Sequence, residues 1–237
     1  MSFPVFCLYP AGRGRVSGLL PREPGQIMRE ELILASKSAG RAQILRHAGL
    51  KAEMCGADID ERALEAEFTR QWAEQPANSA AALPPALAQA LAEAKAQEVS
   101  RRFPQALIIG CDQILELEGA VLHKVASEEE ACQRLMLLAG RTHSLHSAFA
   151  LAAGGAVLRR YVETAHMTMR HVSPDYIRSY LKRADKSVLK SVGVYQIEGP
   201  GIRLFEAVKG DYWAIIGLPL LPLLRELRSL GSLADPV

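Results

Sequence analysis

The ten residues Leu32-Ile33-Leu34-Ala35-Ser36-Lys37-Ser38-Ala39-Gly40-Arg41 decide the fold class of this chain. The first four form an apolar run of a length that suits a buried strand, and apolar residues then recur at helical spacing at Ile44 and Leu45. A strand that enters a helix through a Ser-x-Ser turn places free helix N–H groups beside two hydroxyls and the guanidinium of Arg41. This arrangement indicates an anion site, for phosphate above all. A serine-capped helix that binds no ligand is the alternative.

Strand and helix patterns follow one another along the rest of the chain. A capping-box spacing opens a helix at Ser127, and Ser173-Pro174 opens another. Gly154-Gly155 marks the turn of a long hairpin. Residues 51–57 form a short strand or an extended segment. We expect helices at about 38–48, 62–74, 85–101, 127–138, 173–181 and 219–230, and strands at 32–35, 106–110, 114–117, 121–124, 157–169 and 202–208.

Size and composition exclude several classes of protein. The chain has 237 residues, of which 49% are hydrophobic, so it can form one large domain or two small ones. Its net charge of +2 gives no electrostatic footprint for a nucleic acid or an anionic membrane. No uninterrupted apolar run approaches the roughly 20 residues that a transmembrane helix needs. The four cysteines are scattered without a C-x-x-C pair, which suits a reducing compartment and predicts a cytoplasmic protein.

The N-terminal 27 residues show neither helical nor strand periodicity. They contain four prolines and several arginines, and their apolar stretch is too short for a signal peptide. We therefore expect residues 1–27 to be a disordered extension, or translation to start at Met28.

Carboxylates occur at two places where a catalytic group or a metal ligand could lie. Asp112 follows the buried run 106–110, and catalytic groups of α/β enzymes commonly lie beyond the carboxyl end of a strand. A turn-capping role is the alternative for Asp112. Three carboxylates cluster within Asp58-Ile59-Asp60-Glu61. They indicate either the acidic first turn of a helix or a site for a hard cation.

Basic and imidazole side chains give weaker signals. Lys95 on a long alanine-rich helix and Lys124 at a strand end are both expected to be solvated on local grounds. His143 and His146 form an H-x-x-H pattern, but on a strand this spacing places them on opposite faces, so we expect no shared metal. The glycine-punctuated segment 191–201 either lines a pocket or forms a plain surface loop.

Taken in order, these motifs make the chain from about Met28 to Gly231 resemble the Maf family of nucleotide pyrophosphatases. Each motif alone is weak, but their order and spacing together are specific. As they stand in this sequence, they are Leu32–Ser38 with Arg41, Asp60-Glu61, Lys95, Ile109–Gln113, Lys124, Gly140–His143, Val192–Gly199, Gly210-Asp211 and Ile216–Pro219.

The resemblance implies a single domain over residues 28–231, with residues 232–237 as a tail. It implies an α/β fold with an elongated mixed β-sheet, flanking helices and a central cleft, similar to the inosine triphosphate pyrophosphatases. It implies hydrolysis of a nucleoside triphosphate to the monophosphate and pyrophosphate with a divalent metal cation, Mg²⁺ or Mn²⁺. By resemblance, Asp112 is the catalytic proton acceptor and lies with Glu61 at the metal. The residues that would bind the phosphates are Ser36, Ser38, Arg41, Lys95 and Lys124.

Three positions, Gly40, Gln113 and Glu198, bear on the base by the same resemblance. Gln113 and Glu198 are similar to the subgroup that acts on 7-methyl-GTP, and a carboxylate can accept hydrogen bonds from guanine N–H groups and favour a positively charged methylated ring. The family's usual Ser-x-Ser-Pro-Arg-Arg reads here with Ala39 and Gly40 in place of proline and the first arginine, and its Lys-Pro reads Lys124-Val125.

Other functions remain as alternatives. A UTP or dTTP pyrophosphatase is one, and a non-catalytic nucleotide-binding regulator of septum formation is another. The absence of G-x-x-x-x-G-K-[ST] and of G-x-G-x-x-G after the first strand argues against a Walker-type ATPase and a dinucleotide-binding dehydrogenase. The expected partner is a nucleoside triphosphate, with neither nucleic acid nor membrane, and the resemblance adds an expected homodimer.

Overall fold

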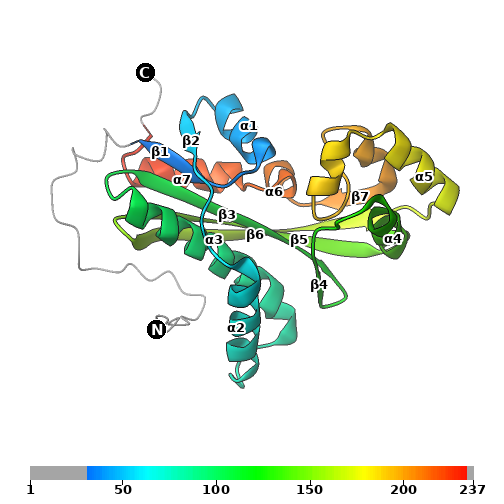
Figure 1. Cartoon of the computed structure of the whole chain (residues 1–237), viewed down its shortest axis with the longest axis horizontal. Helices are drawn as coiled ribbons and strands as arrows, with labels where there is room; N and C mark the ends of the chain where they lie inside the picture. Colours follow the sequence, from blue (N-terminus) through cyan, green and yellow to red (C-terminus); the bar gives the residue numbers. More distant parts are fainter. Residues whose placement is uncertain (1–30, 234–237) are drawn as a thin grey trace.

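A computed structural model describes residues 31–233 of the chain. The expectations for residues 1–27 and for a start at Met28 lie outside these residues. Seven strands form one mixed sheet in the order β2-β1-β3-β5-β6-β7, with β4 paired to β3 (Figure 1). The strands are β1 (Leu32–Ala35), β2 (Ala52–Met54), β3 (Leu107–Leu117), β4 (Ala120–Leu122), β5 (Thr142–Ala153), β6 (Ala156–Met169) and β7 (Phe205–Lys209). The α/β fold with a mixed sheet is thereby confirmed.

The sheet changes direction across β3. Strand β1 lies parallel to β2 and β3, whereas β3, β5, β6 and β7 pair antiparallel in that order. Strands β3, β5 and β6 are long and cross the whole molecule (Figure 1). The pairing of β1 with β3 sets Ala35 opposite Gly110. The turn after β1 is therefore next to Cys111 and Asp112, which is why two motifs far apart in the sequence meet.

Helices cover both faces of the sheet (Figure 1). One face carries α2 (Glu61–Ala73) and α3 (Leu83–Arg102), and the other carries α1 (Ala39–His47), α6 (Tyr212–Ile216) and α7 (Leu220–Ser229) at one end. The far end carries α4 (Glu128–Leu138) and α5 (Pro174–Arg183). Short 3-10 helices are η2 (Ala80–Ala82), η3 (Lys186–Lys190) and η4 (Pro200–Leu204). The expected helix starts at Ser38, Ser127 and Ser173 are confirmed, because each serine hydroxyl accepts from an N–H three residues on.

Several expected boundaries are wrong. The two apolar runs around Asp112 form one unbroken strand of 11 residues, because β5 pairs with residues on both sides of the aspartate. The helix expected at 173–181 continues to Arg183 as α5, and η3 follows it. The strand expected at 202–208 starts only at Phe205, since η4 occupies the residues before it.

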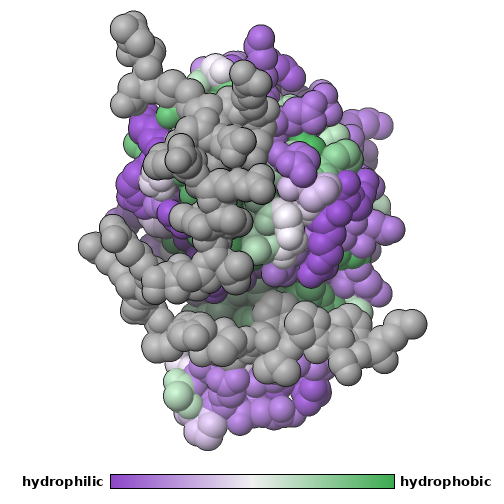
Figure 2. Space-filling model, turned by 90° about the vertical axis from the view of Figure 1, so that its left-hand side faces the viewer, coloured by the Kyte–Doolittle hydropathy of each residue, from purple (hydrophilic) through white to green (hydrophobic). Residues whose placement is uncertain are grey.

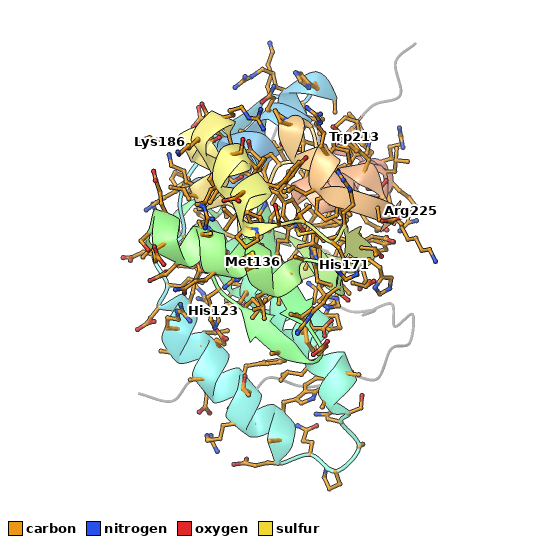
Figure 3. The ribbon with its side chains drawn as sticks, turned by 90° about the vertical axis from the view of Figure 1, so that its right-hand side faces the viewer. His123, Met136, His171, Lys186, Trp213 and Arg225 are labelled. Atoms are coloured by element: carbon orange, nitrogen blue, oxygen red, sulfur yellow. The ribbon has the colours of Figure 1, made fainter. Side chains whose placement is uncertain are left out.

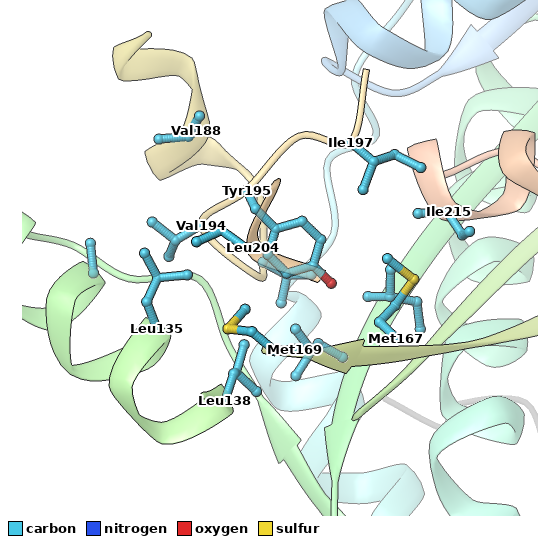
Figure 4. Close-up of a cluster of buried hydrophobic side chains, with 14 of the residues drawn as sticks. Leu135, Leu138, Met167, Met169, Val188, Val194, Tyr195, Ile197, Leu204 and Ile215 are labelled. Carbon is cyan, nitrogen blue, oxygen red and sulfur yellow. The ribbon is translucent and has the colours of Figure 1, made fainter. Parts of the chain in front are cut away.

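The helix α3 packs unusually close to β3. A Cβ atom on Gly110 would lie 2.2 Å from the Ala92 carbonyl oxygen, so only glycine allows this approach. Beneath α4 and α5, a separate hydrophobic cluster surrounds Tyr195 and contains Met167, Met169 and Leu204 (Figure 4). Met167 and Met169 thus pack on the core, as their period-two spacing on β6 predicts.

Hydrophilic side chains predominate in the part of the face that Figure 2 leaves visible beside the grey atoms. Within residues 31–233, no helix combines the length and the apolarity needed to cross a membrane.

Candidate active site

The turn after β1 is organised by its own serines. The Ser38 hydroxyl accepts from the backbone N–H of Arg41 at 3.3 Å and so caps α1. The Ser36 hydroxyl accepts from the Ser38 N–H at 3.2 Å and from Nη1 of Arg41 at 3.3 Å. Both hydroxyls therefore lie at the N-terminal end of a helix, beside a guanidinium, where an anion is favoured.

Arg41 also joins three parts of the chain. Its Nε donates to the carbonyl oxygen of Gly217, which follows α6, at 2.9 Å, and its Nη1 donates to the carbonyl oxygen of Cys111 at 3.0 Å. These two hydrogen bonds fix the guanidinium against β3 and against the residue that follows α6. This fixed position suits a planar donor that presents its remaining N–H groups to a phosphate.

The second part of the site is a buried ion pair on the α3 face of the sheet. The Nζ of Lys95 lies 2.6 Å from Oδ1 of Asp112 and 3.0 Å from Oε1 of Glu61. The side chains of Lys95 and Asp112 are 10% and 11% exposed, whereas that of Glu61 is 54% exposed. The ammonium is therefore shared between one buried and one accessible carboxylate.

Local sequence explains how these three groups meet. Leu91, Ala92 and Ala96 bury one face of α3 against the sheet, and Lys95 is carried on that same face. The Asp60 side chain caps α2, since it accepts from the Ala63 N–H at 3.0 Å, and this places Glu61 in the first helical turn. The acidic cluster is thus a helix start, as one of the two alternatives expects, and Glu61 in its first turn also pairs with Lys95.

Two expectations about this cluster are wrong. Lys95 is buried and paired rather than solvated, because its partners Asp112 and Glu61 are distant in sequence. Asp112 lies within β3 rather than beyond its carboxyl end. Because the next strand, β5, pairs with the whole stretch, the carboxylate is held on a rigid element rather than on a loop.

Gln113 points to the opposite side from this ion pair. Its Nε2 lies 2.8 Å from the Ser147 hydroxyl, 3.1 Å from the Ala214 carbonyl oxygen and 3.0 Å from that of Ile215. The Ser147 hydroxyl also donates to the Ala214 carbonyl oxygen at 2.6 Å. Gln113 therefore ties β3 to α6, and Ser147 is a participant that the sequence pattern did not single out.

The remaining candidates lie outside these contacts. Gly40 sits in the first turn of α1, where a Cβ atom would be 3.8 Å from the Ser38 hydroxyl, so a larger side chain has room to begin there. Lys124 and Glu198 are exposed, on the segment after β4 and on the loop before η4. Lys124 lines a surface hollow with His123 and Arg134.

His123 links the segment of Lys124 to the ion pair. Its Nε2 lies 3.3 Å from Oε1 of Glu65 on α2, one helical turn after Glu61, and Figure 3 shows it beside that helix. The chain neighbour of Lys124 is thus anchored to the helix that carries Glu61.

Burial shifts the pKa of two side chains on the central strands, Cys111 on β3 and His143 on β5. It raises the pKa of the Cys111 thiol to about 11, although Arg41 and Lys95 partly oppose the shift. A protonated, fully buried thiol has little nucleophilic character, which makes Cys111 a packing residue. Burial also lowers the pKa of His143 to about 4, so this imidazole is neutral at pH 7. His143 and His146 both lie on β5, as expected, and bond to different partners, Tyr195 and Thr164.

The donor set fits a hard divalent cation. Oxygens of Glu61 and Asp112 converge on one cation, the Lys95 ammonium. Mg²⁺ is commonly held by one or two carboxylates, several waters and substrate phosphates rather than by a full protein cage. Residues 31–233 contain no cluster of three or more side chains that could hold a metal ion, so a cation here would have Glu61 and Asp112 as its protein carboxylates.

Comparison with known proteins gives a consistent result. The model of a family described as Maf-like protein matches residues 31–230. A protein of Bartonella henselae named 7-methyl-GTP pyrophosphatase is 52% identical over 202 residues, which cover 85% of this chain and 96% of that protein. Proteins with the same name from Bartonella quintana and Mesorhizobium japonicum are each 50% identical, over 88% and 87% of this chain and 100% and 99% of theirs.

Proposed function

This chain belongs to the Maf-like protein family, and on that premise we propose that it hydrolyses 7-methyl-GTP to the monophosphate and pyrophosphate. The observation that carries the proposal is the Lys95 ammonium held between Asp112 and Glu61 beside the Ser36 turn. The names of relatives that share about half of their residues with this chain support the choice of nucleotide. We propose residues 28–231 as one catalytic domain.

The proposed reaction places phosphate charge at the turn after β1. The helix N-terminus, the two serine hydroxyls and the outward N–H groups of Arg41 would bind phosphate oxygens. Lys124 would reach the triphosphate from the segment that His123 anchors to α2. Positive charge around the transferring group is what phosphoryl transfer requires, because charge spreads over its oxygens in the transition state.

Asp112 is the proposed proton acceptor. With Lys95 on Oδ1 at 2.6 Å, the second oxygen, Oδ2, would accept the proton of a water molecule. The water oxygen then bonds to the α-phosphorus, and the bond from that phosphorus to the bridging oxygen breaks, so that pyrophosphate leaves. Glu61 and Asp112 would hold a divalent cation, as in the family generally, which when bound neutralises phosphate charge.

Glu198 is the proposed reader of the base. Its exposed carboxylate can accept hydrogen bonds from guanine N1–H and the 2-amino group, and it favours the positive charge of a 7-methylated ring. The amide nitrogen of Gln113 bonds to α6 and Ser147, so Gln113 would contact the base only through Oε1, as a hydrogen-bond acceptor. Gly40 would leave space near the turn, at the position where the family's usual motif has its first arginine.

The experiment is pyrophosphate release with Mg²⁺ or Mn²⁺ from 7-methyl-GTP, GTP, UTP, dTTP, CTP and ITP. We expect 7-methyl-GTP to be preferred, and Glu198→Gln to lose at least tenfold of that preference because the charge is removed. If UTP or dTTP were preferred instead, the proposed substrate would be wrong and the chain would be a UTP or dTTP pyrophosphatase. Nucleotide binding without turnover would favour the regulator. The mass of the same preparation in solution tests the expected homodimer.

A further inference from the structure

The loop of residues 191–199, which carries Glu198, contains a strained residue. Val194 has φ of 62° and its side chain is completely buried. A β-branched residue in the left-handed region is a true outlier, since its Cβ crowds the backbone, and such strain costs of order 1–3 kcal/mol. It persists only where the surroundings determine the conformation, so the loop must be held from several sides.

Hydrogen bonds from two helices and from the loop itself hold the loop backbone. Arg134 on α4 donates from Nη1 to the Val192 carbonyl oxygen at 2.8 Å. Tyr180 on α5 donates to the Val194 carbonyl oxygen at 3.4 Å. Within the loop, the Ser191 hydroxyl accepts from the Tyr195 N–H at 3.1 Å. Further along the loop, the Ser187 hydroxyl donates to Oε1 of Gln196 at 3.3 Å, the Gly199 N–H donates to the Gln196 carbonyl oxygen at 3.3 Å, and the Ile197 side chain is buried.

Tyr195 adds a side-chain connection between the loop and the sheet. Its ring enters the hydrophobic cluster beneath the loop (Figure 4). The ring also packs edge-on against Phe205, with the ring centroids 4.7 Å apart. Its hydroxyl lies 2.6 Å from Nε2 of His143 on β5, and both side chains are buried. Because β5 is a central strand, this bond connects the loop to the most rigid part of the sheet.

The pair is costly unless the bond is maintained. A buried phenol that loses its partner pays its full desolvation cost, which is of order 1–3 kcal/mol. Among residues 31–233, Nδ1 of His143 has no hydrogen-bond partner, so the imidazole depends on Tyr195 for its polar contact. The loop conformation that satisfies both groups is therefore selected over others.

We propose that Tyr195, held by His143, is a positioning residue for base selection, because it fixes the loop that places Glu198. The inference depends on the proposed function only for the role of Glu198. A merely structural pair would stabilise the whole domain without affecting which nucleotide is preferred. A positioning pair affects the loop and the preference together.

The test is Tyr195→Phe, which removes the hydroxyl and keeps the ring. Tyr161→Phe is the matched control, since it removes a hydroxyl that bonds Glu163 on β6 instead. For Tyr195→Phe we expect faster amide hydrogen exchange confined to residues 191–199. We also expect KM for 7-methyl-GTP to rise about tenfold while kcat changes less than threefold, so the preference over GTP falls.

Variants of His143 check that the two residues act together. His143→Leu should reproduce the effects of Tyr195→Phe, and the double variant should add little, because both remove one interaction. His143→Gln, whose amide can still bond to the phenol, should keep most of the preference.

Two results would overturn the inference. One is an unchanged preference in Tyr195→Phe, equal to that of Tyr161→Phe. The other is faster exchange spread over the whole sheet, which indicates general destabilisation. If the wild type released pyrophosphate from no nucleotide, the proposed function would fail by itself. The exchange experiment would then still decide whether Tyr195 holds the loop, and unchanged exchange at 191–199 would reject it.

Discussion

The contribution of the buried Lys95 ammonium to stability can be tested with Lys95→Met, which nearly keeps the length of the side chain and removes its charge. Methionine is also a good helix former, so α3 itself should be unaffected. The substitution leaves Asp112, whose side chain is 11% exposed, without the cation that lies 2.6 Å away. Glu61 loses the same partner but is 54% exposed and can be solvated.

The expected cost comes almost entirely from Asp112. Removing one partner of a buried ion pair costs about 3–5 kcal/mol, whereas an accessible pair contributes about 0–1 kcal/mol. We therefore expect the free energy of unfolding to fall by about 3 kcal/mol. For a domain of this size, 1 kcal/mol shifts the melting temperature by roughly 2–4 °C, so a fall of about 6–12 °C follows.

The assay is urea unfolding at pH 7, with Arg70→Met as the control. Arg70 on α2 also pairs with two carboxylates, Glu67 and Glu74, but all three are exposed, so its unfolding midpoint should hardly move. Lys95→Met combined with Asp112→Leu removes both charges and should recover much of the lost stability. If the free energy of unfolding of the double variant instead fell by the sum of the falls in the two single variants, the reasoning from an unpaired buried charge would be refuted.

Two further predictions concern stability. The unfolded chain binds a proton at His143 with a pKa near 6.5, whereas burial lowers the folded pKa to about 4. Stability is thus full above pH 6.5 and falls by up to about 3 kcal/mol as pH decreases to 4, and His143→Gln should show a smaller fall in unfolding experiments at each pH. Gly110→Ala should cost at least about 1–3 kcal/mol, because its Cβ would meet the Ala92 carbonyl oxygen at 2.2 Å. Gly40→Ala, which has room, is the control, and equal unfolding midpoints for the two variants would contradict the packing argument.

Local patterns were sufficient for features that depend on neighbours in the sequence. The cap at Ser38 and the glycine turn at Gly154-Gly155 were predicted because their partners lie within a few residues. The family motifs also identified the turn after β1 and the acidic pair. These features need no knowledge of what packs against them.

Patterns among neighbouring residues could not show that a charge is neutralised by a residue from another element. Asp112 suggested a break in the strand because a charge rarely sits between two buried apolar runs, but Lys95 on α3 compensates it. The solvated state expected for Lys95 failed for the same reason. Likewise, the acceptors of Gln113 lie about a hundred residues later, on α6, so its tie to that helix could not be read from its neighbours.

The most direct test of the account is pyrophosphate release from 7-methyl-GTP by the wild type and by Asp112→Asn. Asp175→Asn, on the exposed surface of α5, controls for the loss of a carboxylate. We predict that Asp112→Asn loses at least a hundredfold in kcat and still binds the nucleotide, whereas Asp175→Asn matches the wild type. Near wild-type turnover by Asp112→Asn would contradict the central role of this carboxylate.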